Sequence, residues 1–149
     1  MATSRRRDIA NFLVGELKKI DGGVSTFDSS YTYQVNLFDN VFRRLKFLDE
    51  INDFPSVYLQ AGTENRIYDS KGLTTSTLDI MLRVYVHTET SIEELESTMQ
   101  DIEFVIYNMD TEKYGMMDVQ VSTMSTDEGL LDPYGIGEVG VTVQYDVTD

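Results

Sequence analysis

The sequence predicts an α+β fold: a mostly antiparallel sheet of four to five strands, two helices packed on one face, and a long projecting β-hairpin. Apolar residues recur at helical spacing in residues 5–20 and 91–109, and they alternate at strand spacing across residues 56–87 and 117–147. The resulting order is helix, weak strand, two strands, helix, two strands. Because each element buries its apolar face against another, this order is typical of a two-layer domain.

The first helix is predicted over residues 5–20. Its apolar residues are three or four positions apart, and Gly22 and Gly23 follow it as a stop signal. Residues 21–36 are predicted to be loop with a short strand at 31–35, and residues 40–46 fit either a strand or a helix. A single turn over 47–52 is expected to end before Pro55, because a residue that precedes proline disfavours helical backbone.

Residues 56–68 and 73–87 are the predicted arms of the hairpin, joined by Asp69-Ser70-Lys71-Gly72 as its turn. These arms exceed the usual strand length of about five or six residues, so we expect the tip to project. Ser91 and Glu94 form a possible capping box for the second helix, residues 91–109. The closing strands are expected near 117–121 and 139–147, with a loop over 129–137 between them.

Composition excludes several classes of protein. A chain of 149 residues fits one domain, residues 1–149, whose core is large enough to be stable without a disulfide or a structural metal. Its lack of cysteine excludes a disulfide framework, a zinc–thiolate site and a cysteine nucleophile. No run approaches the roughly 20 apolar residues of a membrane span, and the basic start leads into an amphipathic helix instead of a signal peptide. We therefore expect a protein that makes no membrane contact.

Charge is strongly segregated along the chain. Residues 1–46 hold eight Lys or Arg and five Asp or Glu, a net charge of +3, whereas residues 47–149 hold four and twenty-one, a net charge of −17. The acidic part repels phosphate backbones, which disfavours nucleic-acid binding over most of the surface. Arg43, Arg44 and Lys46 interleave with aromatic residues, a pattern that could stack single-stranded nucleic acid. In an acidic chain we interpret the basic zones as contacts with a protein partner.

No catalytic constellation is evident, and we expect neither a cofactor nor a metal. The carboxylates are too scattered to single out a hydrolytic pair, although a small acidic hydrolase remains a distant alternative. Asp127, Glu128 and Asp132 could hold Ca²⁺, but they lack EF-hand spacing. His87 ends a strand without a recognisable catalytic partner. The glycines at 135, 137 and 140 have dinucleotide-fingerprint spacing but enter a strand, where a fingerprint would open a helix.

Taken as a whole, the chain resembles the tail terminator (tail completion) family of long-tailed bacteriophages. The resemblance covers nearly the whole chain and rests on element order together with five segments. These segments are the first helix through Ile9, Leu13 and Leu17; Phe54-Pro55; Arg83-Val84-Tyr85-Val86-His87; the acidic helix 91–109; and the closing run 137–147. Other neck or head–tail connector proteins, such as head completion or stopper proteins, are the nearest alternative.

The resemblance implies a virion protein of the tail or neck that is not an enzyme and that assembles in the host cytoplasm. It implies a hexameric ring that caps the tail tube, ends tube polymerisation and joins the tail to the neck and head, while viral DNA passes through without binding specifically. The implied partners are further copies of this chain, the major tail tube protein and a neck or head completion protein.

Site residues are assigned under this implied role. The tube-facing hairpin is expected to use Arg66, Tyr68, Asp69 and Lys71. An acidic channel lining is expected from Glu93, Glu96, Asp101 and Glu103. Subunit contacts are expected from two basic pairs and two aromatic residues: Arg5, Arg6, Arg43, Arg44, Phe104 and Tyr107.

Overall fold

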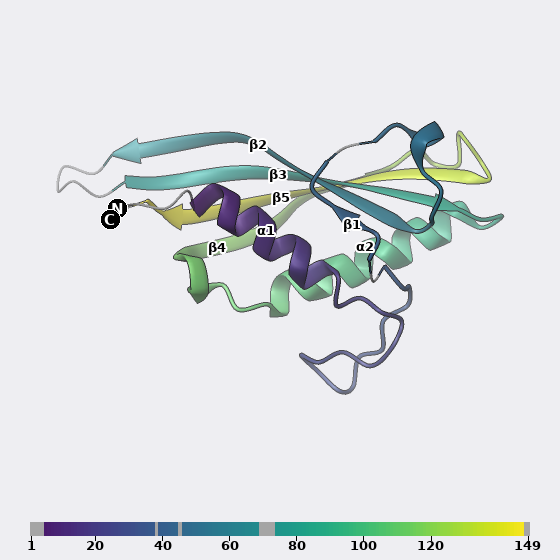
Figure 1. Ribbon diagram of the computed structural model, residues 1–149, viewed down its shortest axis with the longest axis horizontal. Helices are drawn as coiled ribbons and strands as arrows, with labels where there is room; N and C mark the ends of the chain where they lie inside the picture. Colours follow the sequence, from purple (N-terminus) through teal and green to yellow (C-terminus); the bar gives the residue numbers. More distant parts are fainter. Residues whose placement is uncertain (1–4, 38, 45, 69–73, 148–149) are drawn as a thin grey trace.

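The computed structural model describes residues 5–37, 39–44, 46–68 and 74–147. Its element order confirms an α+β fold with two α-helices and five strands (Figure 1). The elements are α1 (Arg5–Leu17), β1 (Val41–Phe42), the 3₁₀ turn η1 (Leu48–Glu50), β2 (Ser56–Tyr68), β3 (Thr74–His87), α2 (Ser91–Asn108), the 3₁₀ turn η2 (Glu112–Tyr114), β4 (Met116–Thr126) and β5 (Tyr134–Asp146).

The five strands form one mixed sheet in the order β1-β2-β3-β5-β4. Three of the pairings are antiparallel, but β1 runs parallel to β2, with Val41 opposite Val57. The sheet is therefore mostly antiparallel, as predicted, but mixed, because this edge pairing is parallel. A parallel neighbour requires a crossover connection of about a dozen residues, which residues 43–55 provide.

The strands β2 and β3 occupy nearly the predicted hairpin arms. They pair from Ser56 opposite Tyr85 to Tyr68 opposite Thr74, with an irregularity between Ala61 and Glu64. The predicted tip, residues 69–72, lies outside the described residues, so its projection stays a prediction. On its other side β3 pairs along almost its full length with β5, which makes β3 the central strand of the sheet.

Both α-helices lie on the same face of the sheet (Figure 1). α1 packs against β1 and β2, and α2 packs against β3, β5 and β4. Between the layers lie alternate strand residues and one stripe from each helix, which explains the sequence periodicity. The most deeply buried members of this core include Ile9, Leu13, Leu17, Leu59, Leu78, Leu82, Val84, Leu95, Ile102, Val139, Val141 and Val143.

Several predicted boundaries were wrong. Helix α1 ends at Leu17, although Ile20 is still buried. The expected strand at 31–35 is replaced by isolated bridges, Val24 with Thr32 and Asp21 with Asn36. The final strand begins at Tyr134, inside the expected loop. The capping box at α2 is also absent, because Ser91 is the first helical residue and its hydroxyl donates to Asp132 at 2.9 Å.

The helix-free face is partly covered by the segment before β2. There Ile51, Tyr58 and Tyr85 form a second small buried cluster, against which Leu48 and Phe54 pack. In the described part of the chain, no helix is both long and apolar enough to cross a membrane.

Candidate functional site

A basic surface lies at the β1 edge of the sheet, and we define it as Phe42, Arg43, Arg44 and Lys46. Arg43 donates to Asn11 Oδ1 of α1 at 2.9 Å. Phe42 is 38% exposed and stacks on Tyr58 with ring centroids 5.3 Å apart. Lys46 Nζ lies 5.6 Å from the centre of the Phe42 ring. This surface therefore combines exposed cations with an exposed aromatic ring.

The other two predicted contact arginines are engaged within the chain. Arg5 donates to the Tyr114 carbonyl at 3.1 Å, and Arg6 donates to the carbonyls of Ala61 and Gly62 at the irregularity in β2. These bonds anchor the start of α1 to the sheet and to η2. Arg43 and Arg44 are instead exposed, although Arg43 also donates to Asn11. The structure therefore separates two arginines that are bonded to backbone carbonyls from two that are exposed at the β1 edge.

An acidic groove runs between α2 and β4, near the opposite edge of the sheet. We define it by Glu96, Met99, Gln100 and Glu103 from α2, Met124 from β4, and Glu128 just beyond β4, and its volume is about 330 Å³. Helical spacing explains the α2 residues: Leu95, Met99, Ile102 and Ile106 turn to the sheet, while Glu96 and Gln100 turn outward. Met124 is 41% exposed. Carboxylates therefore surround an apolar floor of two methionines.

A second hollow continues along α2 from the acidic groove. It is lined by Tyr31, Gln100, Glu103, Phe104, Tyr107 and Asn108. Phe104 stacks on Tyr31 with ring centroids 3.8 Å apart, and the hydroxyl of Tyr107 accepts a hydrogen bond from the Val121 amide at 3.1 Å. Tyr107 is nevertheless 55% exposed. The predicted contact residues Phe104 and Tyr107 thus adjoin the groove, although each also has a structural role.

Asp101 does not belong to an exposed acidic wall, which corrects the prediction that it lines a channel. It is 0% exposed. Its Oδ1 accepts from the Tyr31 hydroxyl at 2.7 Å, and its Oδ2 accepts from the amides of Gln34 and Val35 at 2.7 and 3.0 Å. Desolvation by burial raises the pKa of Asp101, and these three bonds offset only part of that effect. The residue fixes the segment around Tyr31 against α2.

The surroundings of Tyr31 also raise the pKa of its hydroxyl. Burial first, and then its bond to Asp101, raise the pKa of Tyr31 to about 12, so its hydroxyl stays protonated as the donor at neutral pH.

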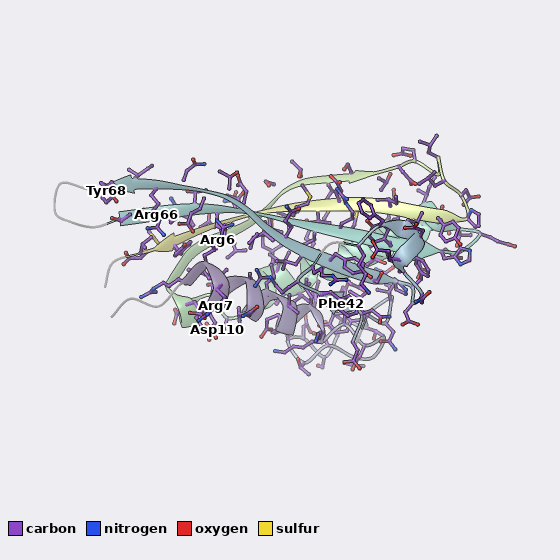
Figure 2. All side chains as sticks on the ribbon, turned by 45° about the horizontal axis from the view of Figure 1, so that its top comes forward. Arg6, Arg7, Phe42, Arg66, Tyr68 and Asp110 are labelled. Carbon is purple, nitrogen blue, oxygen red and sulfur yellow. The ribbon has the colours of Figure 1, made fainter. Side chains whose placement is uncertain are left out.

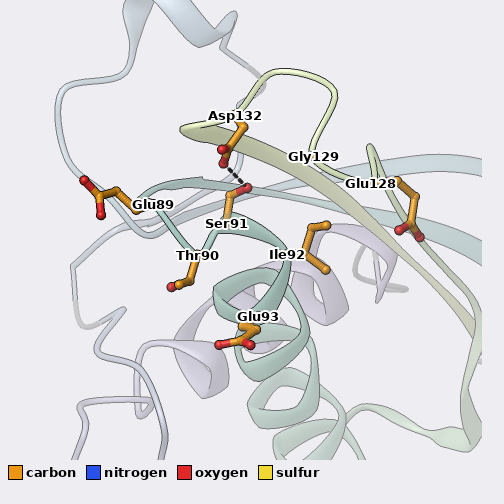
Figure 3. Close-up of a pocket in the computed structure, with 8 residues that line it drawn as sticks. All are labelled: Glu89, Thr90, Ser91, Ile92, Glu93, Glu128, Gly129 and Asp132. Carbon is orange, nitrogen blue, oxygen red and sulfur yellow. Dashed lines mark hydrogen bonds between the residues drawn. The ribbon is translucent and has the colours of Figure 1, made fainter.

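The remaining predicted channel residues lie on exposed or half-buried parts of α2. Glu93 lies at the start of the helix, where it lines a hollow together with Glu89, Glu128 and Asp132 (Figure 3). Carboxylates are favoured at this positive end of the helix dipole. Among the described residues, no group of three or more Asp, Glu, His or Cys could hold a metal ion. Glu96 and Glu103 lie further along, at the acidic groove.

The far end of β2 carries Arg66 and Tyr68, at the end of the molecule away from Phe42 (Figure 2). Tyr68 is 78% exposed and Ile67 is 70% exposed, although Ile67 is not among the predicted contact residues. The sequence pattern of a strand does not show that two successive residues, which point to opposite faces of the sheet, are both exposed to solvent. Asp69 and Lys71, the other two predicted tube contacts, lie outside the described residues.

Glu64 links this end of β2 to β5. It accepts hydrogen bonds from the buried Tyr145 hydroxyl and from Arg66 Nε, the latter at 2.6 Å. Burial raises the pKa of Glu64, but these donors together outweigh burial and leave the pKa below its ordinary value. Arg66 is therefore tied to its own chain as well as exposed to a partner.

His87 is held by aromatic packing. Its ring stacks on Tyr134 at 4.2 Å between centroids, and Phe54 lies 5.6 Å away. This arrangement accounts for the single histidine as a packing residue at the end of β3.

Comparison with known proteins adds three similarities. A family model described as Bacteriophage Tail Tube Terminator Protein matches residues 3–149. Tail tube terminator protein p142 of Escherichia phage T5 is 34% identical over 154 residues, which cover 94% of this chain and 92% of that protein. A chain in the virion of a native gene transfer agent particle shares 8% identity with a TM-score of 0.47, over 73% of this chain and 80% of that chain.

Proposed function

The chain belongs to the bacteriophage tail tube terminator family, and from this premise we propose that it is a structural component of the virion tail that ends polymerisation of the tail tube. The observation that carries the proposal is the family match over residues 3–149, together with 34% identity to a tail tube terminator across nearly the whole chain. This membership favours a terminator over the other neck and head–tail connector proteins. Its mechanism is steric: once it is seated, the tube has no free end to extend.

We further propose that copies of the chain close into a ring, a hexamer, whose two faces meet the tail tube and the neck or head completion protein. A ring built by head-to-tail contacts uses two different surfaces of each subunit. The basic surface and the acidic groove supply two such surfaces at opposite edges of one sheet.

The tube-facing part of this proposal rests on the far end of β2. Arg66 and Tyr68 are exposed there, and Ile67 is 70% exposed beside them. Tyrosine and arginine are enriched among the residues that dominate protein interfaces, and here an exposed isoleucine lies between them in the chain. We expect Ile67 and Tyr68 to contact the last ring of tube protein, with Asp69 and Lys71 following them in the chain.

A complementation experiment tests this role. A phage that lacks the gene for this chain is supplied with wild-type protein, with Ile67→Ser/Tyr68→Ser, or with a variant lacking residues 69–72, and tail lengths are measured by negative-stain electron microscopy. We expect overlong or unjoined tails from both variants, with the purified proteins still folded. Asn65→Ser, at an exposed neighbouring position, serves as the matched control. Normal tails without any supplied protein would refute the proposed function.

Passage of DNA through the ring is the last part of the proposal. An acidic wall would repel phosphates within about a Debye length, roughly 8 Å at physiological salt. Glu93 and Glu89 are exposed at the start of α2 and are the candidates for this wall (Figure 3). Assembled rings of Glu89→Lys/Glu93→Lys should retain DNA at low salt, whereas Glu112→Lys/Asp118→Lys should not. Equal retention by all three proteins would remove the acidic wall from the proposal.

A further inference from the structure

The two edges of the sheet are complementary in charge. We propose that the acidic groove of one copy binds the basic surface of the next, so that subunits join edge to edge in a head-to-tail contact. This inference rests on the ring proposed above and names the surfaces that close it.

Topology makes this contact possible. β1 is at one edge of the sheet and β4 is at the other, and both helices cover the same face between them. The basic surface includes and follows β1, whereas the groove lies between α2 and β4. A second copy approaching edge to edge therefore brings its β1 side to the groove without covering the ends of the strands. Those ends stay open for the tube and the neck.

The groove has the chemistry of a binding surface for cations with apolar stems. Glu96, Glu103 and Glu128 supply three carboxylates around Met99 and Met124. Methionine is unbranched and polarisable, so it adapts to aromatic or aliphatic groups placed on it. The guanidinium groups of Arg43 and Arg44 match carboxylates with two parallel hydrogen bonds, and their methylene stems can lie on the methionines. Phe42, already partly exposed, adds an aromatic anchor beside them.

Charge also selects the direction of the contact. If two copies met through the same edge, arginine would face arginine or glutamate would face glutamate, and such juxtapositions are costly. Opposite edges bring unlike charges together. The contact is therefore heterologous, which produces a ring when the rotation between subunits closes.

This assignment changes the role of two predicted channel residues. Glu96 and Glu103 belong to the subunit contact, next to Phe104 and Tyr107, for which the sequence also predicts a subunit contact. Glu93, at the start of α2, stays with the proposed channel wall. The boundary between contact and channel thus falls within the first turns of α2.

Disulfide trapping tests the contact directly, because the natural chain has no cysteine. Arg43→Cys/Gln100→Cys places one thiol on each surface, so mild oxidation should yield a ladder of covalent oligomers. Each single variant should stay monomeric on a non-reducing gel. Asn65→Cys/Gln100→Cys is the control pair, since Asn65 lies toward the far end of β2. A double variant that gives no more ladder than this control overturns the inference.

A charge exchange provides the second test, with oligomer mass measured by light scattering. Arg43→Glu/Arg44→Glu and Glu96→Arg/Glu103→Arg should each weaken association about ten- to a hundredfold, and combining all four changes should restore most of it. Glu112→Arg/Asp118→Arg should leave association unchanged. Wild-type rings with no effect of reversal and no ladder would refute these surfaces while the ring proposal stands. Absence of both rings and ladder would refute both.

Discussion

The two helices cover one face of the same sheet, yet they are seated in different ways. α2 lies so close to the strands that a Cβ added to Gly135 of β5 would come within 2.9 Å of Leu95 and 3.1 Å of Ser91. Gly15 of α1 is instead exposed, and a Cβ added to it would meet nothing within 4 Å. α1 is seated through Ile9, Leu13 and Leu17, and its start is also held by Arg5 and Arg6, which reach backbone carbonyls. The difference teaches that α2 covers a backbone position of the sheet that has no room for a side chain, whereas the start of α1 has additional polar anchors.

This difference agrees with the proposed roles of the two edges. A groove must keep its shape to receive a partner, and its floor is set by a closely packed helix. A surface of arginines can adjust as it enters the groove of a neighbouring copy, because the side chains carry their charge on flexible stems. Four substitutions test the comparison, from the largest expected effect to the smallest.

Replacing Asp101 should cost the most stability. Asp101→Ala leaves two backbone amides and the Tyr31 hydroxyl without their acceptor in a buried position, so we expect a loss of about 2–4 kcal/mol in the free energy of unfolding. Urea unfolding followed by circular dichroism measures it. Glu96→Ala, exposed on the same helix, should change stability by less than about 0.5 kcal/mol. Equal effects of the two substitutions would show that the segment around Tyr31 is not fixed by Asp101.

Gly135→Ala tests the close seat of α2. The added methyl group must displace the side chains of Val86 and Leu95, with Ser91 Cβ 3.1 Å away, so we expect a loss of about 1–3 kcal/mol. Thermal unfolding of the variant beside wild type provides the comparison. An unchanged melting temperature would mean that α2 can move away from the sheet at no cost in stability. That result would contradict a fixed shape for the acidic groove.

Glu64→Gln tests the polar link on β2, the strand that α1 covers. Because donors hold the pKa of Glu64 below its ordinary value of 4.5, the ionised carboxylate stabilises the folded state above that pH. The advantage of wild type over the variant should be largest near pH 7 and should disappear as the pH falls through the lowered pKa. Chemical unfolding at pH 7, 5 and 3 measures this trend. An advantage that grows toward low pH would contradict the assigned charge state.

Gly15→Ala should give the smallest change, and of opposite sign. Gly15 is exposed in the interior of α1, where alanine restricts the unfolded chain and favours helix, so we expect a gain of about 0.4–1 kcal/mol. Thermal unfolding under the conditions used for Gly135→Ala allows the two glycines to be compared directly. Destabilisation at Gly15 would contradict its placement on the exposed side of α1.

Much of the fold was accessible from the sequence because periodicity reports which face of an element is buried. The alternation around Leu78, Leu82 and Val84 predicted β3 nearly to its bounds, and the stripe through Leu95 and Ile102 predicted α2 within one residue. The parallel edge strand β1 was not accessible, since two residues are too few to show a period. The segment near Tyr31 was predicted as a strand, but it forms only isolated bridges. Its conformation depends on hydrogen bonds to Asp101, 66 to 70 positions away, which local sequence does not reveal.

The predicted assembly residues also divide into those that the sequence identified and those that only the structure could place. Arg43, Arg44, Phe104 and Tyr107 were singled out from charge and helical spacing, and the structure places them on the basic surface or beside the groove. Asp101 looked like its acidic neighbours on α2, because spacing alone does not show that the Tyr31 segment covers that side of the helix. Ile67 was missed because an apolar residue in a predicted strand resembles any other core residue. Met124 was missed because it lies beyond the predicted strand 117–121, whereas β4 extends to Thr126.

By itself, the sequence determined the helices, the long strands, the segregation of charge and the resemblance to tail terminators, because these depend on local periodicity and on composition. Only the tertiary structure decided which charges are available to a partner. It buried Asp101, engaged Arg5 and Arg6 with backbone carbonyls, and left Arg43 and Arg44 at one sheet edge opposite the acidic groove at the other. The physical reason is that burial and hydrogen bonding are set by residues distant in the chain, which meet only when the sheet and its helices pack.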